Sequence, residues 1–309
     1  MSTRETGELI DQENFQRPRD RIMSAVTQRR ANFAREVCSA GGVRSQALVR
    51  AFAAVPRENY LGRGPWRILR PERLPNGYET TPDDNPVHLC QNVLVAIDEP
   101  RWLNNGHPST LARFLDFLEI QSGDRVLHVG CGVGYYTAII TEIVGTAGHV
   151  AAVEIEPNLA ARARANLSSY SHVEVLQGDG GACDAGPRDV IFVNAGATHP
   201  QPLWLSRLAP GGRLLFPLTV SPGSGGIAGG YMLRVARTAG GHAAKCVSPV
   251  GIFSCEGARE QDVERRLHRA YGRGEHELVE ELRLDTHALD STCWLHEAGW
   301  CLSKRPFRQ

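Results

Sequence analysis

The stretch Asp124-Arg-Val-Leu-His-Val-Gly-Cys-Gly-Val-Gly-Tyr-Tyr-Thr137 joins a short apolar run to three glycines spaced two residues apart and then to a second apolar run. Val126, Leu127 and Val129 are typical of a buried strand, whereas glycines let the backbone turn tightly and approach a ligand closely. The N–H groups at the start of a following helix would face the same ligand. The pattern therefore predicts a cofactor-binding loop between a strand and a helix.

The spacing of the glycines separates three classes of cofactor. A phosphate-binding P-loop needs a lysine followed by serine or threonine, but Gly134 is followed by Tyr135 and Tyr136. A dinucleotide loop has a third glycine at the position of Tyr135, where a ring would obstruct close packing of helix on strand. The remaining pattern, G-x-G-x-G, is that of class I methyltransferases that use S-adenosylmethionine.

Two acidic residues downstream fit a nucleoside ligand. Val150–Glu156 reads as a second strand that ends in acid, and Glu154 stands where the ribose hydroxyls would lie. The alternative is a charge at a strand end that simply faces solvent. Val173–Gly180 offers a third short strand followed by Asp179, which we expect to accept a hydrogen bond from the adenine amino group.

Strands and helices then alternate along the chain. Asp189–Gly196 and Pro210–Pro217 are apolar runs typical of parallel strands covered on both faces, and Leu159–Leu167 and Pro202–Leu208 have helical spacing. This order predicts an α/β fold with a Rossmann-like, doubly wound parallel sheet. In such sheets the ligand lies beyond the carboxyl ends of the strands, where the glycine loop and Asn194 both fall.

The chain resembles the protein-L-isoaspartate O-methyltransferases, most of all bacterial members with extended ends. The resemblance covers much of residues 43–220 and rests on five blocks in order: Ala54-Val-Pro-Arg-Glu-Asn-Tyr60, Gly123–Thr137, Gly178-Asp-Gly180, Asn194-Ala-Gly-Ala197 leading to Pro200, and Pro210–Pro217. It implies transfer of a methyl group from S-adenosylmethionine to a carboxylate, in the family that of an L-isoaspartyl residue.

One set of residues is predicted to bind the cofactor: His128, Gly130, Gly132, Gly134, Tyr135, Thr137, Glu154, Ile155, Asp179, Gly180 and Asn194. His128 departs from the family, which usually has glutamate at this position of the first strand. An acid attracts the positively charged amino group of the cofactor, whereas a neutral imidazole offers only a hydrogen bond. The alternative, which we favour over a catalytic role, is that His128 packs within the fold.

The predicted acceptor segment is Leu103-Asn-Asn-Gly-His-Pro-Ser-Thr110. Ungapped alignment back from Gly123 places Gly106 where the family has a serine associated with the methyl-accepting carboxylate. The resemblance therefore leaves isoaspartyl specificity open. Neighbouring side chains would supply the donors, and the predicted catalytic residues are Asn105, His107 and Ser109. The alternative for Ser109 is an N-cap of a helix over Leu111–Ile120.

The predicted reaction needs little acid–base help, because a carboxylate nucleophile is already deprotonated near neutral pH. We expect no metal in the site and find no catalytic triad in the sequence. Two other functions remain: a tailoring methyltransferase that acts on an aspartate carboxylate of a modified peptide or on a small molecule, and a non-catalytic module that only binds the cofactor.

Composition limits the partners and the location that we expect for the protein. The 309 residues carry 34 basic and 34 acidic side chains, which gives no overall attraction to nucleic acid, and Arg17–Arg35 reads as a solvated helix face. No apolar run approaches the length needed to cross a bilayer and the amino end lacks a signal-peptide core, so we expect no membrane partner and a cytoplasmic location. The eight cysteines form no C-x-x-C pair and are expected to be free thiols, with zinc binding as the less favoured alternative.

Three regions are expected. Residues 1–100 form a helical amino-terminal region whose segment from residue 62 covers the cofactor. Residues 101–230 form the cofactor-binding core, and Ser221–Gly230 is a Gly/Ser-rich connection. Residues 231–309 form a carboxyl-terminal extension that closes the sheet or contacts substrate.

Overall fold

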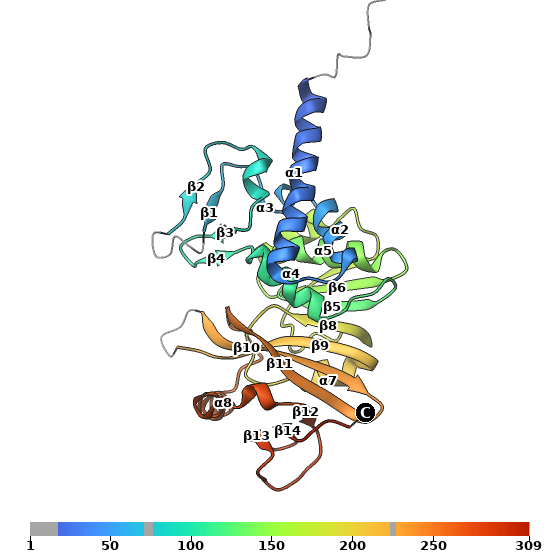
Figure 1. Ribbon diagram of the computed structural model, residues 1–309, viewed down its shortest axis with the longest axis vertical. Helices are drawn as coiled ribbons and strands as arrows, with labels where there is room; N and C mark the ends of the chain where they lie inside the picture. The colour runs from blue at the N-terminus through green and yellow to red at the C-terminus, as the bar shows by residue number, and fades with distance from the viewer. Residues whose placement is uncertain (1–17, 71–76, 223–226, 309) are drawn as a thin grey trace, which may run out of the picture.

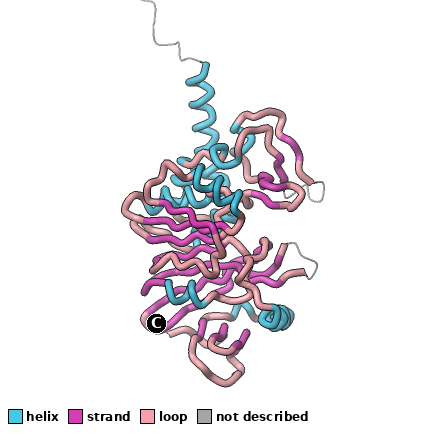
Figure 2. Tube along the Cα trace, turned by 180° about the vertical axis from the view of Figure 1, so that it is seen from behind, coloured by secondary structure: helices cyan, strands magenta, loops and turns pink. Residues whose placement is uncertain are grey.

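The computed structural model describes residues 18–70, 77–222 and 227–308. Its centre is a sheet of ten strands in the order β13-β14-β12-β11-β10-β9-β8-β5-β6-β7. Helices cover both faces of the sheet, so the predicted α/β fold class is confirmed (Figures 1 and 2).

One half of the sheet is parallel and carries the glycine loop. Its strands are β5 (Arg125–Val129), β6 (His149–Glu154), β7 (Val173–Gln177), β8 (Arg188–Val193) and β9 (Leu208–Val220). Strand β5 pairs with β6 on one side and with β8 on the other, so the order of connection reverses between β5 and β8. Such a reversal opens a crevice at the carboxyl ends of the strands.

The other half is antiparallel and consists of β10 (Ala228–Thr238), β11 (Gly241–Ile252), β12 (Glu281–Arg283), β13 (Cys293–Glu297) and β14 (Trp300–Ser303). Strand β10 pairs antiparallel with β9, which joins the two halves through backbone hydrogen bonds. The predicted parallel sheet is thus one half of a larger mixed sheet, and the carboxyl-terminal residues extend it. Helix α8 (Gln261–Arg273) lies beside these strands and buries Val263 and Leu267.

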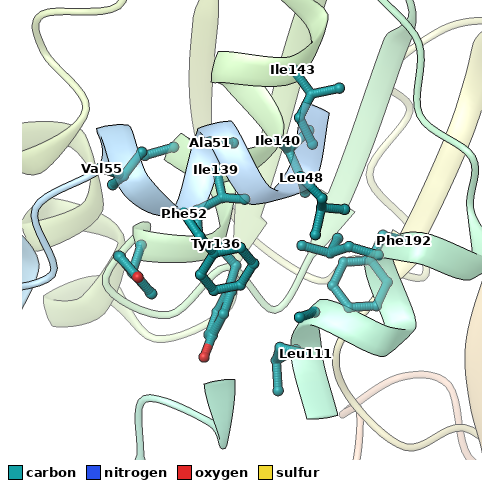
Figure 3. Close-up of a cluster of buried hydrophobic side chains, with 14 of the residues drawn as sticks. Leu48, Ala51, Phe52, Val55, Leu111, Tyr136, Ile139, Ile140, Ile143 and Phe192 are labelled. Carbon is teal, nitrogen blue, oxygen red and sulfur yellow. The ribbon is translucent and has the colours of Figure 1, made fainter. Parts of the chain in front are cut away.

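The first face of the sheet is covered by α1 (Pro18–Gly41), α2 (Gln46–Ala54), α4 (Pro108–Phe117), α5 (Tyr135–Val144) and α6 (Pro157–Asn166). Their buried apolar side chains form one cluster with Val126 of β5, whereas Leu127 and Val129 belong to the cluster on the other face, as strand alternation requires. Figure 3 shows part of this cluster, where Phe52 and Leu48 of α2 lie against Tyr136 and Ile139 of α5. The second face packs against α7 (Pro202–Arg207), through Trp204, and against α8.

A small second sheet, in the order β2-β1-β3-β4, lies beside the helices (Figure 1). It contains β1 (Arg67–Leu69), β2 (Glu79–Thr80), β3 (Leu94–Asp98) and β4 (Leu103–Asn104), with the 3₁₀ helix η3 (Pro86–Leu89) before β3. The apolar run Asn92–Ile97 is typical of a strand, and β3 occupies most of it. Arg57, next to the short helix α3 (Glu58–Leu61), is 3% exposed and donates to the carbonyl of Val93 over 3.0 Å. The Val-Pro-Arg-Glu element therefore anchors this small sheet.

The alternative role of Ser109, as the N-cap of a helix, is wrong. Helix α4 begins at Pro108, its N-cap is His107, and Ser109 lies inside the first turn. Proline suits this position because the first helical N–H has no partner within the helix.

Residues 1–17 and 223–226, which include parts of the predicted amino-terminal region and of the Gly/Ser-rich connection, lie outside the described residues. Among the helices that the structure describes, none combines the length and the apolar character that a membrane span requires.

Candidate active site

The glycine loop follows β5 at the reversal of strand order. Gly130, Gly132 and Gly134 have φ values of +74°, +56° and +89°, a region that other residues adopt only with strain. A Cβ on Gly130 would lie 3.1 Å from the carbonyl oxygen of Asn194, so the loop runs directly beside the end of β8. A Cβ on Gly132 would meet nothing within 4 Å, so the backbone there borders open space.

Glu154 connects the end of β6 to this loop. The side chain is buried, and its Oε2 accepts from the backbone N–H of Gly132 over 2.7 Å while Oε1 accepts from that of Glu156 over 3.1 Å. Each carboxylate oxygen has two lone pairs, so both can accept a further hydrogen bond from a hydroxyl. Ile155 is 37% exposed although it is a large apolar residue, which leaves a hydrophobic surface beside the carboxylate.

Asp179 and Gly180 follow β7. Asp179 Oδ1 accepts from the N–H of Gly181 over 2.8 Å. Gly180 is needed for packing, because a Cβ there would lie 2.1 Å from Cγ1 of Val129. The backbone of Gly257 touches the carboxylate of Asp179, since a Cβ on Gly257 would lie 2.0 Å from Oδ2. The carboxyl-terminal half therefore reaches the predicted adenine end of the site.

The segment after β11 forms this contact. Its backbone pairs with the loop after β8: the N–H of Gly196 donates to the carbonyl of Phe253 over 2.7 Å, and the N–H of Cys255 donates to the carbonyl of Gly196 over 2.8 Å. Burial and the nearby carboxylate of Asp179 raise the pKa of Cys255 to about 12, so its thiol is neutral at physiological pH. Sequence reasoning missed this wall of the site. The one signal in the sequence was the glycine at position 257, which in the structure has a φ of +81°.

Three predicted cofactor residues point into the core instead of the crevice. His128 is 1% exposed, hydrogen bonds through Nδ1 to Oγ1 of Thr137 over 2.9 Å, and stacks on Phe192. Burial lowers the pKa of His128 to about 3, which keeps the imidazole neutral. The ring of Tyr135 is buried against the aromatic rings of Phe52, Tyr60 and Tyr136. Its backbone N–H, at the start of α5, is the group that remains near the loop.

The predicted acceptor segment forms a local network at the start of α4. His107 donates from Nε2 to the carbonyl of Asn92 over 3.0 Å, so its Nδ1 accepts from the hydroxyl of Ser109 over 3.2 Å. Ser109 also accepts from Asn92 Nδ2 over 3.0 Å. The polar atoms of His107 and Ser109 are therefore held by local partners. Asn105 differs, because its buried Nδ2 has no hydrogen-bond partner among the described residues.

Gly106, which the ungapped alignment places at the family serine, has a φ of +71°. A Cβ there would lie 2.9 Å from Cδ2 of Leu111 and 3.4 Å from the ring of Tyr136. The backbone of this segment therefore requires glycine, and a serine would need the loop to take another path. The hydroxyl is absent because residue 106 is glycine, and the local backbone conformation disfavours a serine there.

Two contacts join the predicted acceptor segment to elements that border the crevice. The hydroxyl of Tyr136 donates to the carbonyl of Gly106 over 3.3 Å, which holds the segment against the first turn of α5. At its other end, Arg101 forms two hydrogen bonds with the carboxylate of Glu156, just beyond Glu154. Residues 101–106 therefore extend from the end of β6 to the start of α5. Trp102, between these two contacts, is 46% exposed.

These residues fit S-adenosylmethionine. The open space at Gly132 allows a ligand to approach the backbone, the oxygens of Glu154 can accept from ribose hydroxyls, and Ile155 offers an apolar surface for a flat ring. The Nδ2 donor of Asn105, in the segment held against α5, has no partner among the described residues. A separate cavity of about 420 Å³ is bordered by α1 instead of the glycine loop. The residues that line it are Arg29, Glu36, Arg70, Gln91, Asn92, Val93 and His107.

Comparison with known proteins gives a consistent picture. The sequence model of the protein-L-isoaspartate(D-aspartate) O-methyltransferase family (PCMT) matches residues 28–223. The chain is 31% identical to a protein-L-isoaspartate O-methyltransferase of Ignicoccus hospitalis over 232 residues, which cover 74% of this chain and 97% of that protein. Its identity to the protein of the same name from Methanothrix thermoacetophila is 35% over 180 residues, which cover 56% of this chain and 74% of the relative.

Solved structures agree on the fold. A protein-L-isoaspartate O-methyltransferase superposes with a TM-score of 0.59 at 21% identity, over 83% of this chain and 72% of that one. A Plasmodium falciparum protein described as a protein-L-isoaspartate O-methyltransferase, in complex with S-adenosyl-L-homocysteine, superposes with a TM-score of 0.54 at 15% identity, over 74% and 98% of the two chains.

Proposed function

This chain belongs to the protein-L-isoaspartate(D-aspartate) O-methyltransferase family, and we propose that it methylates a carboxylate of a peptide or protein with S-adenosylmethionine. The observation that carries the proposal is the hydrogen bond between Glu154 and the N–H of Gly132, which joins the predicted ribose acceptor to the glycine loop. The acceptor segment around Gly106 is tied to the helix that follows the same loop. Both reactants would therefore meet at the crevice beyond β5 and β8.

The residues around the loop would hold the cofactor. Gly130 and Gly132 present backbone to it, Glu154 accepts from the ribose, and Ile155 and Asp179 flank the adenine. When bound, S-adenosylmethionine would supply a methyl group on a positively charged sulfur, which a carboxylate oxygen can take by direct displacement. The chain then needs to align the two reactants and exclude water, and no general base is required.

Asn105 is our candidate for a residue that orients the acceptor carboxylate. Its Nδ2 is buried and is without a partner in the described part of the chain, whereas a buried donor normally has one. A carboxylate oxygen in the crevice would satisfy it. His107 and Ser109 would support this segment from behind through their bonds to Asn92.

The acceptor itself is the finer part of the proposal. Family membership favours an L-isoaspartyl carboxylate. The left-handed backbone at Gly106 favours a second candidate, an aspartyl carboxylate of a modified peptide, because the family hydroxyl is missing and the loop cannot hold it without rearrangement. The exposed ring of Trp102 would contact a peptide in either case.

The test is incubation of the protein with methyl-labelled S-adenosylmethionine and two peptides that differ only in L-isoaspartyl against L-aspartyl at one position. Labelling of the isoaspartyl peptide as a base-labile methyl ester would support repair-type activity. Labelling of the aspartyl peptide alone would support the tailoring function. Measurable cofactor binding with no ester formed on either peptide would contradict a peptide carboxylate as the acceptor.

A further inference from the structure

Two histidines and two cysteines meet at the end of the antiparallel half, beyond residue 223 where the family match ends. They are His287, Cys293, His296 and Cys301, and their nitrogen and sulfur ligand atoms all lie within 4.8 Å of one another. Cys293 Sγ lies 3.6 Å from His287 Nε2 and 3.8 Å from His296 Nδ1. Around a tetrahedral zinc ion, with bonds of about 2.0 to 2.3 Å, ligand atoms stand roughly 3.3 to 3.8 Å apart. The cluster is thus close to the size of a zinc site.

The hairpin β13–β14 brings three of these side chains together. His296 and Cys301 are opposite each other in the antiparallel register. Cys293 is three residues before His296, so strict alternation would place the two on opposite faces. The register shifts between Cys293 and Leu295, and this bulge returns Cys293 to the side of His296. The loop between β12 and β13 adds His287.

Neighbouring groups orient the cluster in the way that metal ligands are usually supported. His287 Nδ1 donates to the carbonyl oxygen of Asp285 over 3.1 Å, so Nε2 is the unprotonated nitrogen and faces Cys293. The backbone N–H of Asp290 points to Cys293 Sγ over 3.5 Å. Arg283 holds the carboxylates of both Asp285 and Asp290, which fixes the loop that carries His287.

The composition of the cluster selects among its possible uses. A nucleophilic cysteine must be accessible to its substrate, but Cys301 is fully buried. A disulfide between the two cysteines would not explain why nitrogen atoms of both histidines face the Sγ of Cys293. Two thiolates and two imidazoles in a compact, closed set are typical of structural zinc.

We propose that His287, Cys293, His296 and Cys301 bind one Zn²⁺ in a closed tetrahedral site. The ion would join the β13–β14 hairpin to the loop before it, in a region whose strands are only three to five residues long. It would also position Trp300, next to Cys301, whose ring stacks on His199 in the loop after β8 at a centroid distance of 6.4 Å. The site is therefore structural, and it acts at a distance from the crevice.

The metal content of the full chain tests this proposal. We expect about one zinc per chain by elemental mass spectrometry after dialysis against a weak chelator. Cys293→Ser and Cys301→Ser should each lower the content at least tenfold. Cys183→Ser, a change of a partly buried thiol outside the cluster, is the matched control and should leave the zinc content unchanged.

Two further measurements cover variants that fail to fold. His296→Cys keeps four ligands and should retain zinc. Cobalt(II) loaded into the wild type should give the intense visible absorption of a tetrahedral site and a thiolate charge-transfer band. Wild-type protein that takes up neither metal under reducing conditions, or a native disulfide between Cys293 and Cys301 found by peptide mapping, would overturn the proposal.

Discussion

The two halves of the sheet differ in how they use their strands. In the parallel half, β8 is buried along nearly its whole length, as expected of a strand covered on both faces. In the antiparallel half, β11 is longer and mostly half-exposed, with only scattered buried residues. The parallel half places the proposed cofactor-binding groups at strand ends, whereas the antiparallel half supplies a wall through Gly257 and a scaffold behind it. One continuous sheet thus combines a cofactor-binding half and a supporting half.

The halves nevertheless share one hydrophobic cluster. It contains Leu127 and Ile191 of the parallel half together with Leu267 and Trp294 of the carboxyl-terminal half. Strand β9 pairs with β8 on one side and with β10 on the other, so backbone hydrogen bonds connect the two halves continuously. We therefore expect the two halves to unfold together.

Trp294→Ala should break the supporting half most severely. Trp294 is 2% exposed, packs against Tyr271 of α8 and donates from Nε1 to the carbonyl of Gly274 over 2.7 Å. Removal of a buried tryptophan side chain costs about 3 to 5 kcal/mol in the free energy of unfolding. Urea unfolding followed by circular dichroism should show this loss in a single transition, with loss of cofactor binding at the same urea concentration.

The control for this change is Leu289→Ala, because Leu289 belongs to the same region but is 72% exposed. It should alter the free energy of unfolding by less than about 0.5 kcal/mol. If Trp294→Ala instead produced a second, separate transition while cofactor binding persisted, the two halves would be independent units.

Glu154→Gln should act on the cofactor-binding half alone. The amide keeps the shape of the side chain but loses the charge that accepts from the N–H of Gly132 and that we propose accepts from the ribose. Hydrogen bonds to a charged group contribute about 1.5 to 3 kcal/mol, so we expect the dissociation constant of S-adenosylmethionine to rise by roughly ten- to a hundredfold. Isothermal calorimetry would measure it.

Glu174→Gln is the matched control, because Glu174 is exposed on the neighbouring strand β7. Its dissociation constant for the cofactor should equal that of the wild type. An unchanged constant in Glu154→Gln would reject the assignment of Glu154 to the ribose.

The parallel half could be predicted from the sequence because its signals are local. The glycine loop, the apolar strands and the helices between them occur in chain order, and Val126, Leu127 and Val129 all lie in β5 as predicted. The position of Glu154 beside the loop follows from parallel pairing of adjacent strands. These features depend on residues close to one another in the sequence.

The supporting half could not be predicted in the same way. The contact of Gly257 with Asp179 and the meeting of Cys293 with His296 depend on a distant pairing and on a bulge. Neither feature has a local pattern. The same holds for Tyr135, whose ring is buried against Phe52 and Tyr60 of the amino-terminal region, and for His128, which is buried between Thr137 of α5 and Phe192 of β8.

A pair of glycines sharpens the comparison further. Gly132 and Gly145 have φ values of +56° and +62°, and at both a Cβ would meet nothing within 4 Å. Alanine at either position should cost about 1 to 2 kcal/mol of stability, because of the left-handed backbone. Gly132→Ala should in addition weaken cofactor binding by about tenfold, since its methyl group enters the space assigned to the ligand.

Gly145→Ala, at the end of α5, should lose the same stability without any change in the dissociation constant of the cofactor. Thermal unfolding and calorimetry on both variants would separate the two effects. Equal cofactor affinities in the two variants would show that the open space at Gly132 is not the ligand site.

The last expected effect depends on pH and concerns His128, which is packed in the core of the parallel half. Because its pKa is about 3 in the folded protein and 6.5 for the free group, the unfolded chain binds a proton between these pH values that the folded protein does not. The free energy of unfolding should therefore fall, through this group, as the pH decreases through 6.5, with a slope that approaches about 1.4 kcal/mol per pH unit near pH 5. His128→Gln removes the titrating group and keeps a polar partner for Thr137.

The variant should lose stability less steeply than the wild type between pH 6.5 and pH 5, which urea unfolding at several pH values would measure. Other histidines with lowered pKa values, among them His149 and His199, remain in both proteins and cancel in the comparison. Parallel stability curves would mean that folded His128 accepts a proton readily. In that event the imidazole could attract the carboxylate of the cofactor, and its place in the core would have to be reconsidered.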